Sequence, residues 1–136
     1  MIMSSYLNIY GVLKDSEKKI YLASFSRNHS LYQAINDNLY VIWGGDEKTY
    51  TDLTSTDVQR VISSINKQIS DIDKRISECD RHANGNMDII NDIISFKEFR
   101  EELVSTKEYL YFLDELIDNT TYNYEDAFEK IVCNIS

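Results

Sequence analysis

The sequence predicts an α+β fold: a small antiparallel three-stranded sheet and a short helix pack on a long antiparallel helical hairpin, followed by a short C-terminal helix. Three observations lead to this prediction. Apolar residues between Val58 and Ala83 recur in alternating steps of four and three, which places them on one stripe of a long helix, as in a coiled coil. A second long apolar stretch follows Asn86. Before position 45, apolar and polar residues alternate, which indicates strands.

The predicted hairpin covers residues 54–118. Thr54 can cap the first arm, because Asp57 three residues later completes a capping box. Gly85 can take the left-handed backbone that ends a helix, and Asn86 can cap the second arm. The apolar seam of the first arm is expected to face the second arm, although it could also pair with a second copy in a homodimer. Its residues are Val58, Ile62, Ile65, Ile69, Ile72, Ile76, Cys79 and Ala83.

Residues 1–50 are expected to contain the sheet. Alternation predicts strands at 6–12 and 19–25, joined as a hairpin, and a third strand at 39–43, with a short helix from about 30 to 36. Gly11 within the first strand indicates a bulge or a close approach of another group. At the other end, Asn123 is placed to cap a last helix over 123–134, with one apolar face made by Ala127, Phe128, Ile131 and Val132.

Length and composition favour one globular domain over 1–136, since 136 residues with 43% hydrophobic content can bury a core. No apolar run approaches the roughly 18 residues of a membrane span, and the N-terminus lacks a signal-peptide pattern. Two cysteines far apart, Cys79 and Cys133, are typical of a reducing compartment. We therefore expect a protein of the cytoplasm.

The negative charge is concentrated in the second part of the chain. Acids and bases balance in residues 1–50, so the net charge of −9 belongs to residues 51–136. Such a surface repels nucleic acid and anionic membranes, and it attracts basic protein surfaces, including those that bind nucleic acid. The alternative is that acidic helices only keep the protein soluble.

One turn is a candidate ligand site. Ser26, Arg27, Asn28 and His29 lie between a predicted strand and a predicted helix that contains Tyr32. Free backbone N–H groups at a helix start, together with a guanidinium and an imidazole, could bind an anionic nucleotide. The alternative is an ordinary capped turn with exposed polar residues.

Metal binding and catalysis are not expected. His82 follows Cys79 by three residues, but a zinc site needs two further ligands, and Cys133 and His29 are the only candidates. Adjacent carboxylates such as Glu101 and Glu102 do not face each other on a helix. Because no nucleophile, phosphate-loop or dinucleotide motif is present, the sequence predicts a non-enzyme without cofactor or metal.

A protein-interaction surface is the stronger expectation. Ten tyrosines and one tryptophan are present, and tyrosine offers a large contact area with a polar tip. The alternative is that these rings pack across the strands of the sheet itself. The residues predicted for the interaction surface are Tyr6, Tyr10, Trp43, Glu98, Glu101, Glu102, Glu108, Asp114 and Glu115.

Three short segments resemble small phage and prophage accessory proteins: Tyr6-Leu7-Asn8-Ile9-Tyr10, Ala23-Ser24-Phe25-Ser26-Arg27 and Leu31-Tyr32-Gln33. The short, acidic, proline-free composition is similar as well. The resemblance covers about a third of the chain and transfers no functional residue. It implies an inhibitor of a host defence, such as a CRISPR nuclease or a nucleotide-signalling system, acting in the host cytoplasm. A small-ligand binder and a virion or scaffold component are the alternatives.

Overall fold

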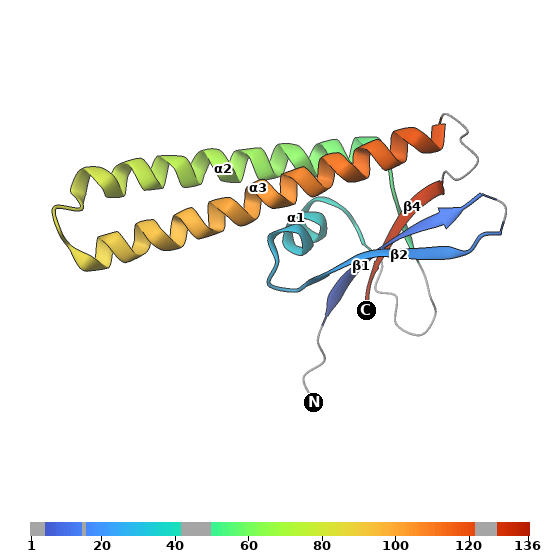
Figure 1. Cartoon of the computed structure of the whole chain (residues 1–136), viewed down its shortest axis with the longest axis horizontal. Helices are drawn as coiled ribbons and strands as arrows, with labels where there is room; N and C mark the ends of the chain where they lie inside the picture. Colours follow the sequence, from blue (N-terminus) through green and yellow to red (C-terminus); the bar gives the residue numbers. More distant parts are fainter. Residues whose placement is uncertain (1–4, 15, 42–49, 122–127) are drawn as a thin grey trace.

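The computed structural model describes residues 5–14, 16–41, 50–121 and 128–136. Within them the protein is α+β, with a sheet of four antiparallel strands and three helices. Figure 1 shows α2 and α3 as a long side-by-side pair, with the sheet and α1 beneath one half of it. The elements are β1 (Tyr6–Leu13), β2 (Lys19–Ser26), α1 (Ser30–Asn38), β3 (Thr51–Leu53), α2 (Ser55–His82), α3 (Met87–Thr121) and β4 (Phe128–Ile135).

The sheet has the order β2-β1-β4-β3, so the expectation of three strands was wrong. The expectation of a C-terminal helix was also wrong for residues 128–134, which belong to β4, a strand inside the sheet; positions 123–127 lie outside the described residues. Residues from Ile131 to Ile135 are all buried, as a strand covered on both faces requires. A short apolar run of this kind does not distinguish a helix from a central strand by its periodicity.

The third strand lies elsewhere than predicted. Leu39 ends α1, where its backbone N–H donates to the carbonyl oxygen of Ile35 at 2.8 Å, and positions 40 and 41 have no regular structure. The remaining two positions of that predicted strand, including Trp43, lie outside the described residues. The strand is instead Thr51–Leu53, which pairs with β4.

The ends of the two long helices follow the local sequence signals. Thr54 and Asp57 form the predicted capping box, and the Asn86 side chain accepts the backbone N–H of Asp88 at 2.9 Å. Gly85 has a φ of 79°, so the left-handed turn residue is confirmed. α3 continues to Thr121, three residues beyond the predicted end of the hairpin.

Polar contacts at three levels show that α2 and α3 run antiparallel. Arg100 contacts Asp73 at 2.6 Å, Lys107 donates to Asn66 at 3.1 Å, and Ser55 donates to Asp114 at 2.8 Å. Several seam residues of α2 are buried in the same core as apolar residues of α3. The seam from Val58 to Ile76 is therefore packed within the chain, so a homodimer would need another surface. The shared core residues include Val58, Ile62, Ile65, Ile72, Leu103, Leu110 and Leu113.

One face of the sheet completes this core. Leu7 and Ile9 of β1 and Cys133 of β4 are fully buried together with Leu31 of α1. At Gly11 the close approach predicted from the sequence is present, because an added Cβ would lie 2.6 Å from the Phe128 ring. A glycine is therefore needed at this position for β4 to pack.

Candidate interaction surface

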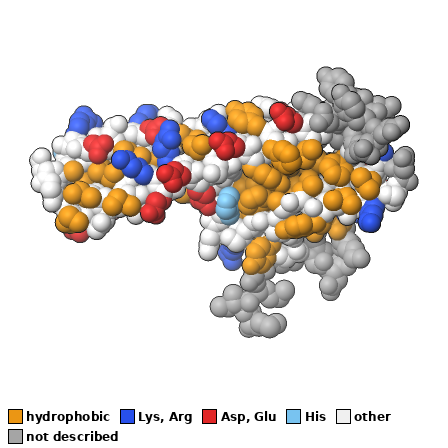
Figure 2. All heavy atoms as spheres, in the orientation of Figure 1, with side chains coloured by type: hydrophobic (Ala, Val, Ile, Leu, Met, Phe, Trp, Pro, Cys, Tyr) orange, Lys and Arg blue, Asp and Glu red, His pale blue; other side chains and the backbone are white. Residues whose placement is uncertain are grey.

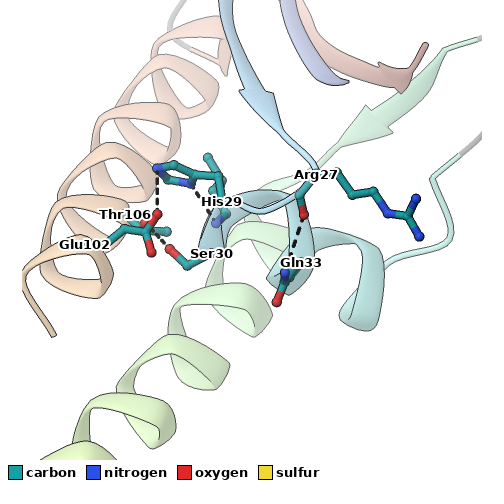
Figure 3. A network of polar contacts seen from close by, with 7 residues as sticks. Arg27, His29, Ser30, Gln33, Glu102 and Thr106 are labelled. Atoms are coloured by element: carbon teal, nitrogen blue, oxygen red, sulfur yellow. Dashed lines mark hydrogen bonds and ion pairs between the residues drawn. The ribbon is translucent and has the colours of Figure 1, made fainter. Parts of the chain in front are cut away.

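The predicted ligand turn attaches α1 to α3. His29 caps α1, with its Nδ1 atom accepting the backbone N–H of Leu31 at 3.0 Å, and its Nε2 atom lies 3.6 Å from an oxygen of Glu102 (Figure 3). The hydroxyls of Ser30 and Thr106 form a buried hydrogen bond of 2.8 Å. Both contacts join the start of α1 to α3, so these polar groups have a packing role.

The other residues of this turn do not converge on a common point. The Arg27 side chain points away from His29 and Glu102 (Figure 3), Asn28 is exposed and Tyr32 is buried. Ser26 contributes its carbonyl oxygen, which accepts the His29 backbone N–H at 3.0 Å. The Glu102 carboxylate would repel an anion at this helix start. The geometry thus offers no observation in favour of an anionic ligand.

The six predicted acidic residues of α3 divide into two groups. Glu102 turns toward His29, and Asp114 turns toward α2, where it accepts hydrogen bonds from Ser55 and Gln59. The other four are exposed, and their spacings of three, seven and seven residues place them on one face of the helix. We call Glu98, Glu101, Glu108 and Glu115 the acidic stripe.

The acidic excess belongs to α3 and not to α2. α2 carries five acids and five bases, whereas α3 carries nine acids and three bases. No contact of the acidic stripe with a base is present among the described residues. The stripe is therefore a local concentration of unpaired negative charge.

A row of aromatic rings lies beside the stripe, and sequence reasoning did not assign it to the surface. The rings of Phe25 and Tyr109 are 5.3 Å apart between centroids, and those of Tyr109 and Phe112 are 5.8 Å apart. We call Phe25, Tyr109 and Phe112 the aromatic row. Phe112 is 49% exposed. The sequence contained one signal for this surface position. Phe112 follows Glu108 by four residues and precedes Glu115 by three, so it lies on the same helix face as these two glutamates.

The Tyr109 hydroxyl is buried and has no hydrogen-bond partner among the described residues. Burial, with a smaller contribution from nearby Tyr21, raises the pKa of Tyr109 to about 12.

Figure 2 shows apolar side chains gathered over α3 and the strand beneath it on this face of the molecule. The aromatic row belongs to α3 and β2, two of the elements that contribute apolar residues to this part of the molecule.

The predicted tyrosines lie on the other face of the sheet. Tyr6 and Tyr10 alternate along β1 with the core residues Leu7 and Ile9. Tyr6 is 44% exposed, while Tyr10 packs edge-on against Tyr21 and Tyr50. The predicted tyrosines and the acidic stripe therefore do not form one continuous surface.

A polar row crosses this face of the sheet. Asn8 accepts a hydrogen bond from Ser24 at 2.6 Å and donates to Asn134 at 3.3 Å and to Ser136 at 2.6 Å. Asn8 and Asn134 are buried, so these bonds satisfy polar groups that water cannot reach. The row joins β2, β1 and β4 through their side chains.

The described surface also has hollows, among them these two. One of about 510 Å³ follows α2 beside Ser70 and Ser77, and the other, of about 370 Å³, lies beside Tyr50, Lys19 and Lys130.

Among residues 5–14, 16–41, 50–121 and 128–136, no three His, Cys, Asp or Glu side chains are grouped to hold a metal ion. In the same part of the chain, no helix has the length and apolar character needed to cross a membrane.

Comparisons with known proteins return no match, whether against protein-family models, curated proteins or solved structures. The class of the protein is therefore given by its fold, which is α+β. The exposed residues of α3 include the acidic stripe and Phe112 of the aromatic row.

Proposed function

We propose that this chain is a non-enzymatic interaction protein that binds a basic surface of another protein through the acidic stripe and the aromatic row. The observation that carries the proposal is the half-exposed Phe112, which lies between Glu108 and Glu115 on the solvent side of α3. An aromatic ring surrounded by charge is a common centre of a protein interface, because the ring supplies buried area while the charges select the partner.

The distribution of charge supports binding over simple solubility. Negative charge needed only for solubility has no reason to collect on one helix, yet α2 is balanced and α3 is not. A row of carboxylates on a rigid helix attracts basic residues and speeds association. It also disfavours direct binding to nucleic acid and to anionic membranes.

The partner that we propose is a host defence protein with a basic nucleic-acid channel, which the acidic stripe would occupy in the host cytoplasm. The resemblance to phage accessory proteins suggests this target, and the carboxylates of the stripe support it as substitutes for phosphates. Inhibition then requires no catalysis, since occupation of the channel excludes the nucleic acid.

The test uses purified CRISPR effector nucleases with guide RNA, and it measures target-DNA cleavage at increasing concentrations of this protein. We expect inhibition that weakens as salt rises, because the contacts are between charges. The variant E101Q/E108Q/E115Q should inhibit about 10- to 100-fold less strongly, since each ion pair that it removes is worth roughly 0.5–1 kcal/mol.

A matched control removes the same charge from α2. Asp71, Glu78 and Asp80 are exposed, so D71N/E78Q/D80N changes the net charge equally without touching the stripe. This variant should inhibit like the parent protein. An equal loss in both variants would show that net charge acts and not the stripe, and no inhibition of any effector would remove the proposed target.

A further inference from the structure

Within the described part of the chain, no strand lies on the outer edge of β2. β2 stands at the end of the sheet order and pairs with β1 alone among the described strands. Strand β3 at the other end has three residues, whereas β2 has eight. The outward backbone N–H and C=O groups of β2 are thus a template for strand pairing.

β2 has little of the protection that edge strands commonly carry. Its residues from Ile20 to Phe25 include no charge and no proline. Its one irregularity is a shift in the register with β1, because Ile9 pairs with Ala23 while Tyr10 pairs with Tyr21. The part from Ala23 to Ser26 keeps a regular register and is therefore the segment on which a strand can be added.

α3 determines what the added strand would meet. Phe25 of β2 lies against Tyr109, and His29 just beyond β2 lies against Glu102, so α3 runs antiparallel beside β2. The aromatic row borders this edge, and beyond Phe112 are the carboxylates of Glu108 and Glu115. Side chains of an added strand that point toward α3 would reach aromatic rings first and carboxylates next.

This arrangement favours arginine or lysine at those positions. Their apolar stems can lie on the rings while their charged groups reach the glutamates, and arginine also stacks on aromatic faces. Just before this segment, the Tyr21 ring contacts Tyr10 on the opposite face of the sheet and is 60% exposed, so it offers an apolar contact to an added strand that extends past Ala23. The matching segment therefore alternates basic and apolar residues.

A second copy of the chain fits this edge poorly. Antiparallel pairing of two β2 strands would place Lys18 and Lys19 of one copy near Arg27 of the other, and it would bring two acidic stripes together. Like charges in such positions cost free energy. Charge complementarity thus selects a different, basic partner.

We propose that β2 binds an extended segment of a partner protein by strand addition, and that this segment alternates arginine or lysine with apolar residues. This assignment rests on the proposed function, whose acidic stripe supplies the charge, and it adds the backbone pairing that orients the partner.

The test uses a capped synthetic peptide of alternating arginine and valine, with amide hydrogen exchange of the full chain followed by NMR. Two further peptides of the same sequence carry N-methyl groups on alternate residues, one in each phase. Both methylated peptides keep the side chains and the charge of the parent peptide. Because alternate N–H groups of a strand point to the same side, only one of the two peptides loses the N–H groups that face β2. A glutamate-valine peptide is the charge control.

If the arginine-valine peptide adds as a strand, it protects the backbone amides of Ala23–Ser26 that point outward from the sheet. At a peptide concentration of roughly ten times its Kd, these amides should exchange about tenfold more slowly than in the free protein. One N-methylated peptide then binds at least about tenfold more weakly than the other. If all three arginine peptides bind equally and β2 exchange is unchanged, strand addition is overturned while the charge-based function stands. If none of the peptides binds, strand addition is overturned, and the cleavage assay with E101Q/E108Q/E115Q decides separately whether the charge-based function stands.

Discussion

The imidazole of His29 joins two elements, because its Nδ1 atom caps α1 while its Nε2 atom lies 3.6 Å from the Glu102 carboxylate of α3. Sequence reasoning placed these two residues in separate roles, one in a ligand turn and the other on an interaction surface. Their contact shows that this part of α3 is a packing surface for α1, and it separates Glu102 from the acidic stripe.

Replacement of His29 tests this role. His29→Ala removes the cap and should lower the free energy of unfolding by about 1 kcal/mol, while His29→Asn retains a capping acceptor and should cost less. Urea denaturation of both variants measures the difference. Equal losses in the two variants would show that the cap contributes nothing.

Gly11 should not tolerate a side chain. Its added Cβ would lie 2.6 Å from the Phe128 ring, so Gly11→Ala should lower the free energy of unfolding by about 1–3 kcal/mol. The pair Gly11→Ala with Phe128→Leu should lose less than the two single changes together, because a smaller side chain frees the space. Strict additivity of the two changes in urea denaturation would contradict this account.

Removal of the Tyr109 hydroxyl should stabilise the fold. This group is buried without a partner among the described residues, and such a group costs about 1–3 kcal/mol. Tyr109→Phe should therefore raise the thermal midpoint and leave the aromatic row intact. Tyr21→Phe is the matched control, since Tyr21 is 60% exposed and should change little. A loss of stability in Tyr109→Phe would reveal a partner for this hydroxyl.

The two cysteines should differ in reactivity. Cys133 is fully buried in β4, and burial raises its thiol pKa to about 12, whereas Cys79 is partly exposed. The thiolate is the reactive form, so a thiol reagent near neutral pH should modify Cys79 and spare Cys133 until the protein unfolds. Mass spectrometry of the modified native protein identifies the site, and rapid labelling of Cys133 would contradict the buried strand.

Alkaline pH should destabilise the protein through the same buried groups. The pKa of Cys133 is raised from 9.0 to about 12 and that of Tyr109 from 10.0 to about 12. Both groups hold their protons more tightly when folded, so their titration leaves the free energy of unfolding unchanged below pH 9 and lowers it as the pH rises toward 12.

The double variant Cys133→Ala with Tyr109→Phe isolates this effect. Between pH 9 and 12, its free energy of unfolding should decrease less steeply with pH than that of the parent protein, because two of the titrating groups are gone. Urea denaturation across this range measures the slope. An unchanged slope would mean that other groups control alkaline unfolding.

Local signals were sufficient for much of the fold. The Thr54–Asp57 capping box, the left-handed Gly85 and the Asn86 cap depend on atoms within a few residues of each other, so the chain sequence indicates them directly. The same holds for the β1 and β2 strands, whose alternation marks one buried face. These features need no knowledge of distant neighbours.

The site was predicted only in part. The acidic charge of α3 could be counted from the sequence, but the direction of each carboxylate could not, since Asp114 turns to α2 and Glu102 to α1. The contact of Phe25 with Tyr109 requires β2 to pack beside α3, and no pattern within either segment contains that information.

The sequence by itself determined the long helical pair, its caps and the excess of negative charge on one helix, because these depend on periodicity, neighbouring side chains and counting. Only the tertiary structure decided that residues 128–135 form a strand inside the sheet, and which acids of α3 remain exposed. The physical reason is that a short apolar segment takes the conformation that buries it best, and its burial depends on partners distant in the chain, here β1 and β3.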